Sequence, residues 1–341
     1  MTTVLLTHDP VALDLYYGEK ALDGLRALGV DLRLHEGARP LAGEALIAAA
    51  DAADIVISYR GSPGEADVFE RLPRLTAFMR CAVDIRNVDV EAASRNGVLV
   101  TRASPGFAAS VSELILGQVI DLARGITASA TAYHRGKMPP ASMGRQLAGS
   151  TLGIVGYGVI GQHLAPIALA IGMKVLITDP CQGVDDSRFE QVGMPDLLAR
   201  ADIIVCLAVA NEETENLFDA EAFASVKPGA LFINPSRGNL VDEAALESAL
   251  ASGRLAGAAL DVGRAPDQMP SPHLARLPNV IATPHIGGLT PAAIEAQSLE
   301  TVEQVRTLLE GEVPKGAVNA DRTHRLKRFG IDPKGGKSST A

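Results

Sequence analysis

Short apolar runs alternate with segments of helical spacing along almost the whole chain. In the first hundred residues, the apolar runs that predict buried strands cover 3–7, 54–58, 77–82 and 98–100. Between them, helical spacing covers 11–28 and 43–50. Such alternation predicts a parallel sheet that is covered by helices on both faces.

The same pattern restarts at Thr151 and predicts a second sheet. Its strands are expected at 152–155, 174–178, 202–208, 230–234 and 257–260. Its helices are expected at 161–171, 194–199 and 242–251, with a further helix at 291–310. A long amphipathic stretch, 108–134, is predicted to connect the halves as one helix. The last twenty or so residues are polar and rich in Gly and Lys, which predicts a mobile tail.

Length and charge narrow the classes of function. A chain of 341 residues with 47% hydrophobic residues is long enough for two domains and too apolar for wholesale disorder. The formal charge of −9 argues against nonspecific binding to nucleic acid or to an anionic membrane, since both need a basic surface. No apolar run approaches the length of a membrane span. A small anionic substrate would therefore need a local cationic pocket.

The cysteines and the N-terminus indicate a cytoplasmic protein. Cys81, Cys181 and Cys206 lie far apart without a CxxC pair, so neither a disulfide framework nor a metal site is expected. The first residues, MTTVLLTHDP, lack the basic and apolar regions of a signal peptide.

A glycine-rich loop stands between a predicted strand and a predicted helix. Gly156, Gly158 and Gly161 form GxGxxG in LGIVGYGVIG, with Val159 and Ile160 between the last two glycines. In this context the pattern predicts a dinucleotide site, because glycines permit the tight turn, the backbone approach to a pyrophosphate and close helix–strand packing. The alternative is a glycine-rich turn without a ligand.

Asp179 ends the next predicted strand, about 20 residues further on. A carboxylate at this place accepts hydrogen bonds from the adenosine ribose hydroxyls. No arginine stands beside Asp179 to hold a 2′-phosphate, so NAD(H) is favoured over NADP(H). The alternative is an ordinary acid in a turn at a strand end.

Two residues are candidates for chemistry on a carbonyl or hydroxyl group. His285, in ATPHIGG, lies in a rigid turn flanked by glycines that packing explains poorly, whereas other histidines have polar or helical surroundings. His8 ends the first strand, where ligands often bind, but in the half without the phosphate loop. Arg237 follows a predicted strand in LFINPSRG, and its planar fork suits a carboxylate; the alternative is a surface ion pair.

Four segments together, in this order, resemble the D-isomer-specific 2-hydroxyacid dehydrogenases, which include glyoxylate/hydroxypyruvate reductases and phosphoglycerate dehydrogenases. They are LAGSTLGIVGYGVIG (147–161), VKPGALFINPSRGNLVDEAALESAL (226–250), GRLAGAALDV (253–262) and LPNVIATPHIGG (277–288). The resemblance implies two Rossmann-like, doubly wound parallel-sheet domains. An NAD-binding domain would span 102–289. A flavodoxin-like substrate domain would combine 1–101 with 290–341. A homodimer and an active site in the interdomain cleft are also implied.

The resemblance also implies roles for individual residues. His285 is expected as the acid/base and Arg237 as the catalytic residue that holds the substrate carboxylate. Backbone N–H groups of Cys81, Ala82 and Val83 are expected to bind the same carboxylate. The cofactor-binding residues are expected to be Gly156, Gly158, Val159, Ile160, Gly161, Asp179, Pro235, Ser236, Asp261, Gly287 and Gly288.

The segment LDVGRAPDQMPS (260–271) departs from the family pattern. Where the family has a Glu followed by Pro, this chain has Pro266 followed by Asp267. That Glu pairs with the histidine and orients its ring. Either Asp267 reaches His285 from one position further along, or His285 works without a paired carboxylate; an acid this short after a proline has less reach.

The sequence therefore predicts an NAD(H)-dependent oxidoreductase that interconverts a small D-2-hydroxy acid and its 2-keto acid. The alternative is an NAD(H)-binding regulatory protein on the same scaffold with little turnover. Arg237 and His285 favour the enzyme, and the altered Glu position leaves room for the regulator. Arg80 is a candidate for a distal anionic group of the substrate, with a surface arginine as the alternative.

Overall fold

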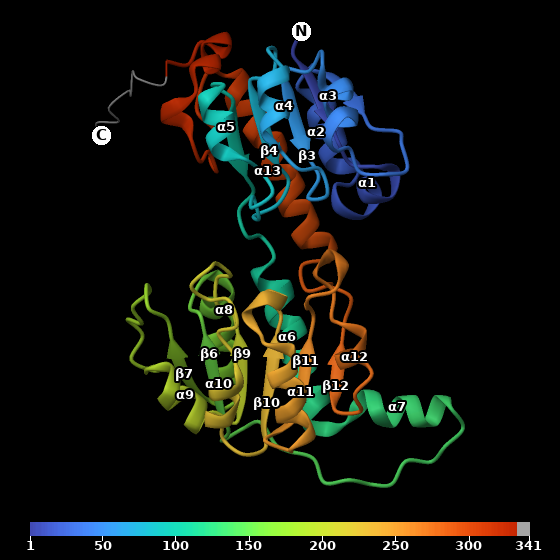
Figure 1. Ribbon diagram of the computed structural model, residues 1–341, viewed down its shortest axis with the longest axis vertical. Helices are drawn as coiled ribbons and strands as arrows, with labels where there is room; N and C mark the ends of the chain where they lie inside the picture. The colour runs from blue at the N-terminus through green and yellow to red at the C-terminus, as the bar shows by residue number, and fades with distance from the viewer. Residues whose placement is uncertain (333–341) are drawn as a thin grey trace. The chain divides into compact units, whose positions relative to one another are not determined.

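The computed structural model describes residues 1–332, apart from the side chain of Asp267. The chain forms two compact units, which Figure 1 shows in ribbon form. The first unit combines residues 1–106 with the segment from Pro291 onward, and the second comprises residues 107–290. Each unit contains its own sheet and its own hydrophobic core.

The first unit contains a five-stranded sheet whose strands all pair in parallel. Its spatial order is β2-β1-β3-β4-β5, which is the flavodoxin-like order. The strands are β1 (Thr3–Leu6), β2 (Asp31–Leu34), β3 (Ile55–Ser58), β4 (Ala77–Arg80) and β5 (Leu99–Arg102). The predicted fold of this half is confirmed.

Helices cover both faces of this sheet, because successive strand residues point to opposite faces. One face packs with Leu25 of α2 and Val305 of α13, and the other packs with Leu46 of α3 and Phe69 of α4. The helices of this unit are α1 (Pro10–Tyr16), α2 (Glu19–Ala27), α3 (Gly43–Ala50), α4 (Ala66–Arg71), α5 (Val90–Arg95) and α13 (Pro291–Leu309).

Two predictions for the first unit were wrong in detail. The single helix expected at 11–28 is two helices, because Gly18 has a φ of 84° and interrupts the α-helical backbone. The expected tail is folded as far as residue 332, with short helices η3 (Ala320–Arg322) and η4 (His324–Phe329). Burial of Leu326 anchors this segment, and Arg325 donates to the carbonyl groups of Leu72 and Leu75. The remaining tail, 333–341, lies outside the described residues.

The second unit contains a seven-stranded parallel sheet in the order β12-β11-β10-β9-β6-β7-β8. The chain order reverses between β6 and β9, as in a Rossmann sheet, and ligands bind at such a reversal. The strands are β6 (Thr151–Val155), β7 (Lys174–Thr178), β8 (Glu190–Gln191), β9 (Ile203–Cys206), β10 (Ala230–Asn234), β11 (Leu255–Leu260) and β12 (Val280–Ala282).

Helices α6 and α8 cover one face of the second sheet, and α9, α10 and α11 cover the other. Shorter helices complete the unit. These helices are α6 (Ala108–Arg124), α7 (Ile126–His134), α8 (Val159–Ala170), α9 (Met194–Arg200), α10 (Ala220–Ser225), α11 (Glu243–Ala251), α12 (Pro272–Ala275), η1 (Gly238–Leu240) and η2 (Pro266–Gln268).

The connecting helix expected at 108–134 is also two helices, α6 and α7. Gly125 separates them with a φ of 66°, which is the left-handed region that favours glycine. Helix α6 buries Val111, Ile115 and Val119 against the sheet, whereas α7 has no buried residue. In Figure 1, α7 and the segment after it extend away from the body of the second unit.

Candidate active site

The glycine-rich loop connects β6 to α8 at the reversal of strand order. Gly156 has a φ of 101°, and a Cβ atom there would lie 2.5 Å from the carbonyl carbon of Leu207. A Cβ atom at Gly161 would lie 2.7 Å from the carbonyl oxygen of Gly156, whereas one at Gly158 would meet nothing within 4 Å. Gly156 and Gly161 therefore serve the turn and the helix–strand packing, and Gly158 leaves the backbone accessible to a ligand.

Asp179 follows β7 and lies beside this loop. Its Oδ2 accepts the backbone N–H of Tyr157 at 2.7 Å, and its Oδ1 accepts those of Cys181 and Gln182 at 2.8 and 2.9 Å. Partial desolvation raises the pKa of Asp179, but these three donors outweigh it and leave the pKa below its ordinary value. The carboxylate is thus ionised and fixed at the edge of the loop.

Asp261 follows β11 and is 1% exposed. Its Oδ1 accepts the Thr283 hydroxyl at 2.6 Å and the Ile286 N–H at 2.9 Å, and its Oδ2 accepts the Gly287 N–H at 2.8 Å. This buried carboxylate therefore holds the loop that carries His285. Sequence reasoning assigned Asp261 to the cofactor and missed this contact, because the residues are more than twenty positions apart.

His285 lies in a tight turn directly after β12. Its φ of 54° is in the left-handed region, which is uncommon for a residue with a side chain. Its N–H donates to the carbonyl of Thr283 at 2.9 Å, and the ring is partly exposed. A Cβ atom at Gly287 would lie 2.9 Å from Oδ2 of Asp261, so the residue after Ile286 must be a glycine for this contact to form.

Arg237 follows β10, and its backbone is held locally. Its carbonyl accepts from Asn234 Nδ2 at 2.9 Å, and its Nη1 donates to the carbonyl of Ser236 at 2.8 Å. The Ser236 hydroxyl donates to the carbonyl of Ala208 at 2.9 Å, so the 235–237 segment is tied to the chain after β9. The side chain of Arg237 is partly exposed.

These three side chains come from one edge of one sheet. The last residues of the neighbouring strands β10, β11 and β12 are in register, as Asn234, Leu260 and Ala282. Arg237, Asp261 and His285 follow them within three positions. The second unit thus gathers a cation, a buried carboxylate and an imidazole at the carboxyl edge of its sheet, where ligands bind in such folds.

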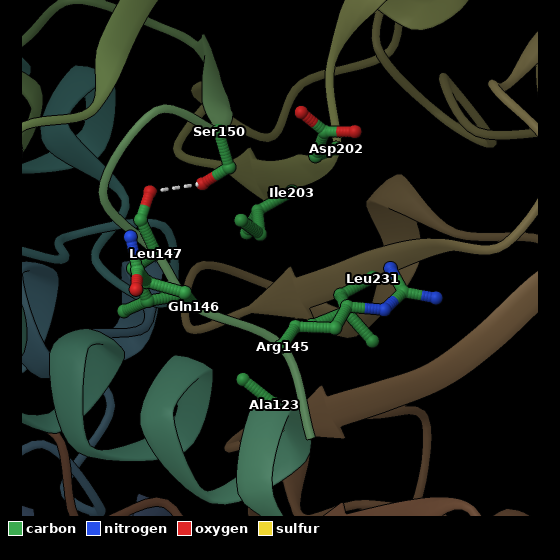
Figure 2. A pocket seen from close by; sticks show the side chains of 8 residues that line it. All are labelled: Ala123, Arg145, Gln146, Leu147, Ser150, Asp202, Ile203 and Leu231. Atoms are coloured by element: carbon green, nitrogen blue, oxygen red, sulfur yellow. Dashed lines mark hydrogen bonds between the residues drawn. The ribbon is translucent and has the colours of Figure 1, made fainter. Parts of the chain in front are cut away.

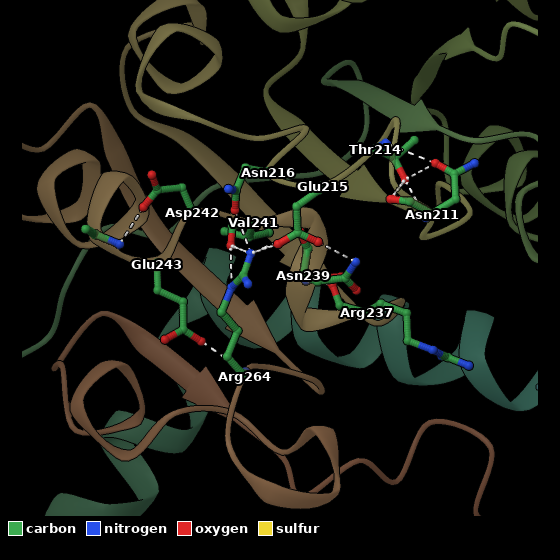
Figure 3. Close-up of polar contacts among 12 residues, drawn as sticks. Asn211, Thr214, Glu215, Asn216, Arg237, Asn239, Val241, Asp242, Glu243 and Arg264 are labelled. Carbon is green, nitrogen blue, oxygen red and sulfur yellow. Dashed lines mark hydrogen bonds and ion pairs between the residues drawn. The ribbon is translucent and has the colours of Figure 1, made fainter. Parts of the chain in front are cut away.

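Arg264 ties together the loops behind Arg237, and sequence reasoning missed it. Figure 3 shows its guanidinium among polar groups of three chain segments. Its Nη2 donates to Asn216 Oδ1 at 2.6 Å, to Glu215 Oε1 at 2.9 Å and to the carbonyls of Asn239 and Val241, each at 3.1 Å. The contacts to Asn239 and Val241 fix the turn that directly follows Arg237.

The loop that contains Pro266 and Asp267 forms the short helix η2. Its ends are pinned by hydrogen bonds from Gly263 N–H to the Gln268 carbonyl, at 2.9 Å, and from Ala265 N–H to the Met269 carbonyl, at 3.1 Å. The side chain of Asp267 lies outside the described part of the chain. Both hypotheses for the missing Glu therefore stay predictions.

Cys81, Ala82 and Val83 follow β4 in the first unit. The Cys81 N–H donates to the carbonyl of Ser58 at 3.1 Å, and the Ala82 carbonyl accepts from Ala103 at 3.0 Å. Burial raises the pKa of the Cys81 thiol to about 12, so this thiol is protonated at neutral pH. Any role of the loop therefore rests on its backbone.

A cavity of about 220 Å³ lies at the opposite, amino edge of the seven-stranded sheet. Figure 2 shows it between Arg145, Asp202 and Leu231. The flanking strands β6 and β9 begin at Thr151 and Ile203, directly after lining residues. None of the predicted site residues lines this cavity.

The described residues contain neither a candidate metal site nor a candidate membrane span. Within residues 1–332, no three His, Cys, Asp or Glu side chains are grouped so as to hold a metal ion. Within the same residues, every helix is too short or too polar to span a membrane.

Residues 116–287 match the family described as D-isomer specific 2-hydroxyacid dehydrogenase, NAD binding domain. The chain belongs to the D-isomer-specific 2-hydroxyacid dehydrogenase family. The resemblance stated from the motifs is thereby confirmed, as is NAD as the expected cofactor.

Relatives of this dehydrogenase family match most of the chain. A D-3-phosphoglycerate dehydrogenase of Mycobacterium tuberculosis is 37% identical over 80% of this chain and 52% of its own length. The chain thus spans about half the length of this relative. A hydroxypyruvate reductase of Thermotoga maritima is 33% identical over 74% of this chain and 83% of its own length. Among solved structures, the TT0316 protein of Thermus thermophilus has a TM-score of 0.83 at 31% identity, covering 93% of this chain and all 100% of that one.

Proposed function

We propose that this protein is an NAD(H)-dependent oxidoreductase that interconverts a D-2-hydroxy acid and its 2-keto acid. The observation that carries the proposal is the gathering of Arg237, Asp261 and His285 at one sheet edge, in the unit that also contains the phosphate loop. Family membership supports the same reaction class.

The phosphate loop fits the pyrophosphate of NAD. The backbone at Gly158 is open, and the 12-residue helix α8 begins at Val159, directly after this glycine. The backbone N–H groups of Val159 and Ile160 are among the unpaired donors of a helix N-terminus, which favours an anion. Asp179 would accept the ribose hydroxyls. Pro235 and Ser236 would line the nicotinamide end of the pocket.

When bound, NADH would supply the hydride for the reduction of the keto carbon. His285 donates a proton to the oxygen as the C=O bond becomes a hydroxyl, and it regains a proton from solvent. Arg237 binds the carboxylate bidentately and polarises the carbonyl. The backbone N–H groups of Ala82 and Val83 would bind the carboxylate as well, whereas the N–H of Cys81, expected from the sequence to do the same, already donates to the Ser58 carbonyl.

We propose two roles for the carboxylate of Asp261. It holds the loop of Gly287 and Gly288 through the contacts described above, and it would accept a hydrogen bond from the nicotinamide carboxamide. A carboxylate has about four acceptor positions, of which the described residues use three. One position remains for an amide donor of the cofactor.

Turnover of NADH with a panel of 2-keto acids tests the function. Glyoxylate, pyruvate, hydroxypyruvate and bulkier keto acids are each mixed with protein and NADH, and absorbance at the nicotinamide band is followed. We expect oxidation with at least one of them, and loss of it in Arg237→Met and His285→Phe. Tight binding of NADH without turnover of any acid would instead support the regulatory protein on the same scaffold.

We infer further that two copies of this chain form a homodimer through α7 and the segment that follows it. Helix α7 has no buried residue, and Ile126, Tyr133, Met138 and Met143 are exposed by 52%, 62%, 86% and 100%. Apolar side chains gathered on one projecting element are typical of an interface. Sedimentation of the wild type and of a Tyr133→Asp, Met138→Asp variant tests this inference, because the variant should sediment as a monomer.

We also propose a cytoplasmic location. Its support is the state of the cysteines: Cys81, Cys181 and Cys206 are all unpaired with one another, which suits a reducing compartment. Fractionation of cells that produce the protein would test this.

A further inference from the structure

Buried polar atoms without hydrogen-bond partners gather at the carboxyl edge of the five-stranded sheet. They are both ring nitrogens of His8, the hydroxyls of Ser58 and Ser62, and Nε of Arg80. All four residues are at most 1% exposed. Buried polar groups almost always have partners, and an unsatisfied one is costly, so this concentration indicates that a ligand or water serves them.

These four residues come from three neighbouring strands. His8 follows β1, Ser58 ends β3 with Ser62 shortly after it, and Arg80 ends β4. Ser58 and Arg80 are partners in the strand register. The cluster thus occupies the edge at which ligands bind in flavodoxin-like sheets, next to the loop of Cys81.

His8 is held rigidly and is uncharged. Its ring packs against Tyr17 and Tyr59, with centroid distances of 5.1 and 5.2 Å. Burial lowers the pKa of His8 to about 3, and Arg80 lowers it too, while Asp9 opposes the shift. A neutral imidazole has one N–H donor and one acceptor nitrogen, and here both lack a partner.

Three of the five N–H groups of Arg80 already have partners in the protein, and the buried Nε–H is one of the two that remain. Its Nη1 donates to the carbonyl of Tyr59, and its Nη2 donates to Asn87 Oδ1 at 2.6 Å and to the carbonyl of Ser62 at 3.2 Å. The guanidinium thus serves mainly to fix the 59–62 loop. A desolvated anion needs several charge-assisted donors, which this arrangement does not offer.

The groups that remain match a hydroxyl better than an anion. A hydroxyl group donates once and accepts, as do the serine hydroxyls and the neutral imidazole. We propose that His8, Ser58 and Ser62 form a subsite for hydroxyl groups on the substrate chain beyond C2, so that the enzyme acts on hydroxylated 2-keto and D-2-hydroxy acids. The inference rests on the proposed function and deepens it by naming the substrate class.

Strand spacing sets the length of this substrate. The loop proposed to bind the carboxylate follows β4, Ser58 is on the next strand and His8 follows the strand beyond it. Neighbouring strands lie about 4.8 Å apart, so His8 is roughly 10 Å from that loop. A hydroxyl near His8 therefore belongs to an acid of four or more carbons.

Kinetics on matched substrate pairs test the subsite. The pairs are pyruvate with hydroxypyruvate, and 2-oxobutanoate with 4-hydroxy-2-oxobutanoate. We expect the wild type to prefer the hydroxylated four-carbon acid by at least about 10-fold in kcat/KM, because a site built for a hydroxyl rejects an analogue without it. His8→Phe should remove this preference, so that the two four-carbon acids have about equal kcat/KM, and His8→Gln should keep part of it.

Controls separate the subsite from folding. His35→Phe makes the same change at a partly exposed histidine of the first unit and should leave the preference intact. Ser58→Ala removes only an oxygen and should weaken the preference even if His8→Phe does not fold. An unchanged preference in folded His8→Phe and in Ser58→Ala would overturn the proposal, as would a wild-type preference for phosphorylated or sulfonated acids over hydroxylated ones of equal length.

Calorimetry keeps the test independent of turnover. D-2,4-dihydroxybutyrate and D-2-hydroxybutyrate are titrated into NADH-loaded protein. We expect the dihydroxy acid to bind more tightly to the wild type and equally to His8→Phe. If no keto acid is turned over, the proposed function fails, but this difference in affinity would still support the subsite and its absence would overturn it.

Discussion

Oδ2 of Asp261 accepts the backbone N–H of Gly287 at 2.8 Å, two residues beyond His285. A buried acid at the end of one strand thereby fixes the loop that follows the neighbouring strand. Together with the Ile286 N–H, which donates to Oδ1 of Asp261, this contact fixes the backbone directly after His285.

Asp261→Asn should therefore impair catalysis more than folding. An amide nitrogen in place of one oxygen would face an N–H donor, which costs about 1–3 kcal/mol and displaces the loop. We expect kcat to fall by about 100-fold or more, because small misplacements of a catalytic group are costly. Asp242→Asn is the matched control, since Asp242 also accepts two backbone N–H groups but only caps α11. Equal losses in both variants would contradict a role specific to the His285 loop.

Two glycines of the phosphate loop should respond differently to alanine. Gly158→Ala adds a methyl group in open space, so it should fold normally and weaken NADH binding by about 10-fold or more, since the methyl group blocks the backbone approach. Gly161→Ala places a Cβ 2.7 Å from a backbone oxygen and should lower the stability by about 1–3 kcal/mol. Thermal unfolding and NADH fluorescence titration measure the two effects. Normal NADH affinity in Gly158→Ala would refute the assigned role.

Arg264 should act on the substrate through Arg237. Arg264→Leu removes the donors that fix the turn after Arg237, so KM for the keto acid should rise by about 10-fold while NADH affinity is kept. In an Arg237→Lys background the same change should have a smaller effect, because the two act on one binding step. Arg276→Leu, at an exposed arginine of the same unit, is the control. Additive effects in the double variant would show that Arg264 is only structural.

His8 should make stability depend on pH. Its pKa is lowered from 6.5 to about 3 by burial, so between these values the unfolded chain binds a proton that the folded chain does not. The contribution of His8 to the free energy of unfolding is therefore fully present above pH 6.5. It falls as the pH falls toward 3, by up to about 1.4 kcal/mol per pH unit. The free energy of unfolding, measured with urea from pH 7 to pH 4, should change less steeply with pH in His8→Phe than in the wild type or in His35→Phe. Parallel slopes would mean that His8 protonates readily in the folded state.

Asp267→Asn distinguishes the two hypotheses for the altered Glu position. If Asp267 assists His285, removal of its charge should lower kcat by about 10-fold or more and shift the pH–rate profile, since a carboxylate partner favours the imidazolium. If His285 works without it, rate and profile should stay as in the wild type. Stopped-flow measurement of NADH oxidation across the pH range gives both quantities.

Much of the fold followed from patterns within short windows of sequence. The segments 174–178 and 230–234 are strands with the predicted bounds, because short runs of β-branched and apolar residues between turn residues favour buried strands. Errors arose where a single residue interrupted a pattern. Gly18 and Gly125 each divided a predicted helix, since a left-handed glycine ends a helix whatever the apolar spacing around it.

The residues of the candidate site also fall into two groups, those that a local pattern predicts and those that depend on distant contacts. The phosphate loop, Asp179, Arg237 and His285 were predicted as site residues from the sequence, because each stands shortly after a strand in a local pattern. Arg264 was not found, since its partners Asn216 and Asn239 lie on other loops and no spacing rule connects them.

The sequence by itself determined two parallel-sheet units, the place of the phosphate loop and the family, because these depend on the local order of strands, turns and glycines. Only the tertiary structure decided that Asp261 holds the His285 loop, that Arg80 is buried rather than a surface arginine, and that both ring nitrogens of His8 are buried without partners. Such facts depend on which residues meet across strands and on what surrounds a buried polar group, and packing of the whole sheet fixes both.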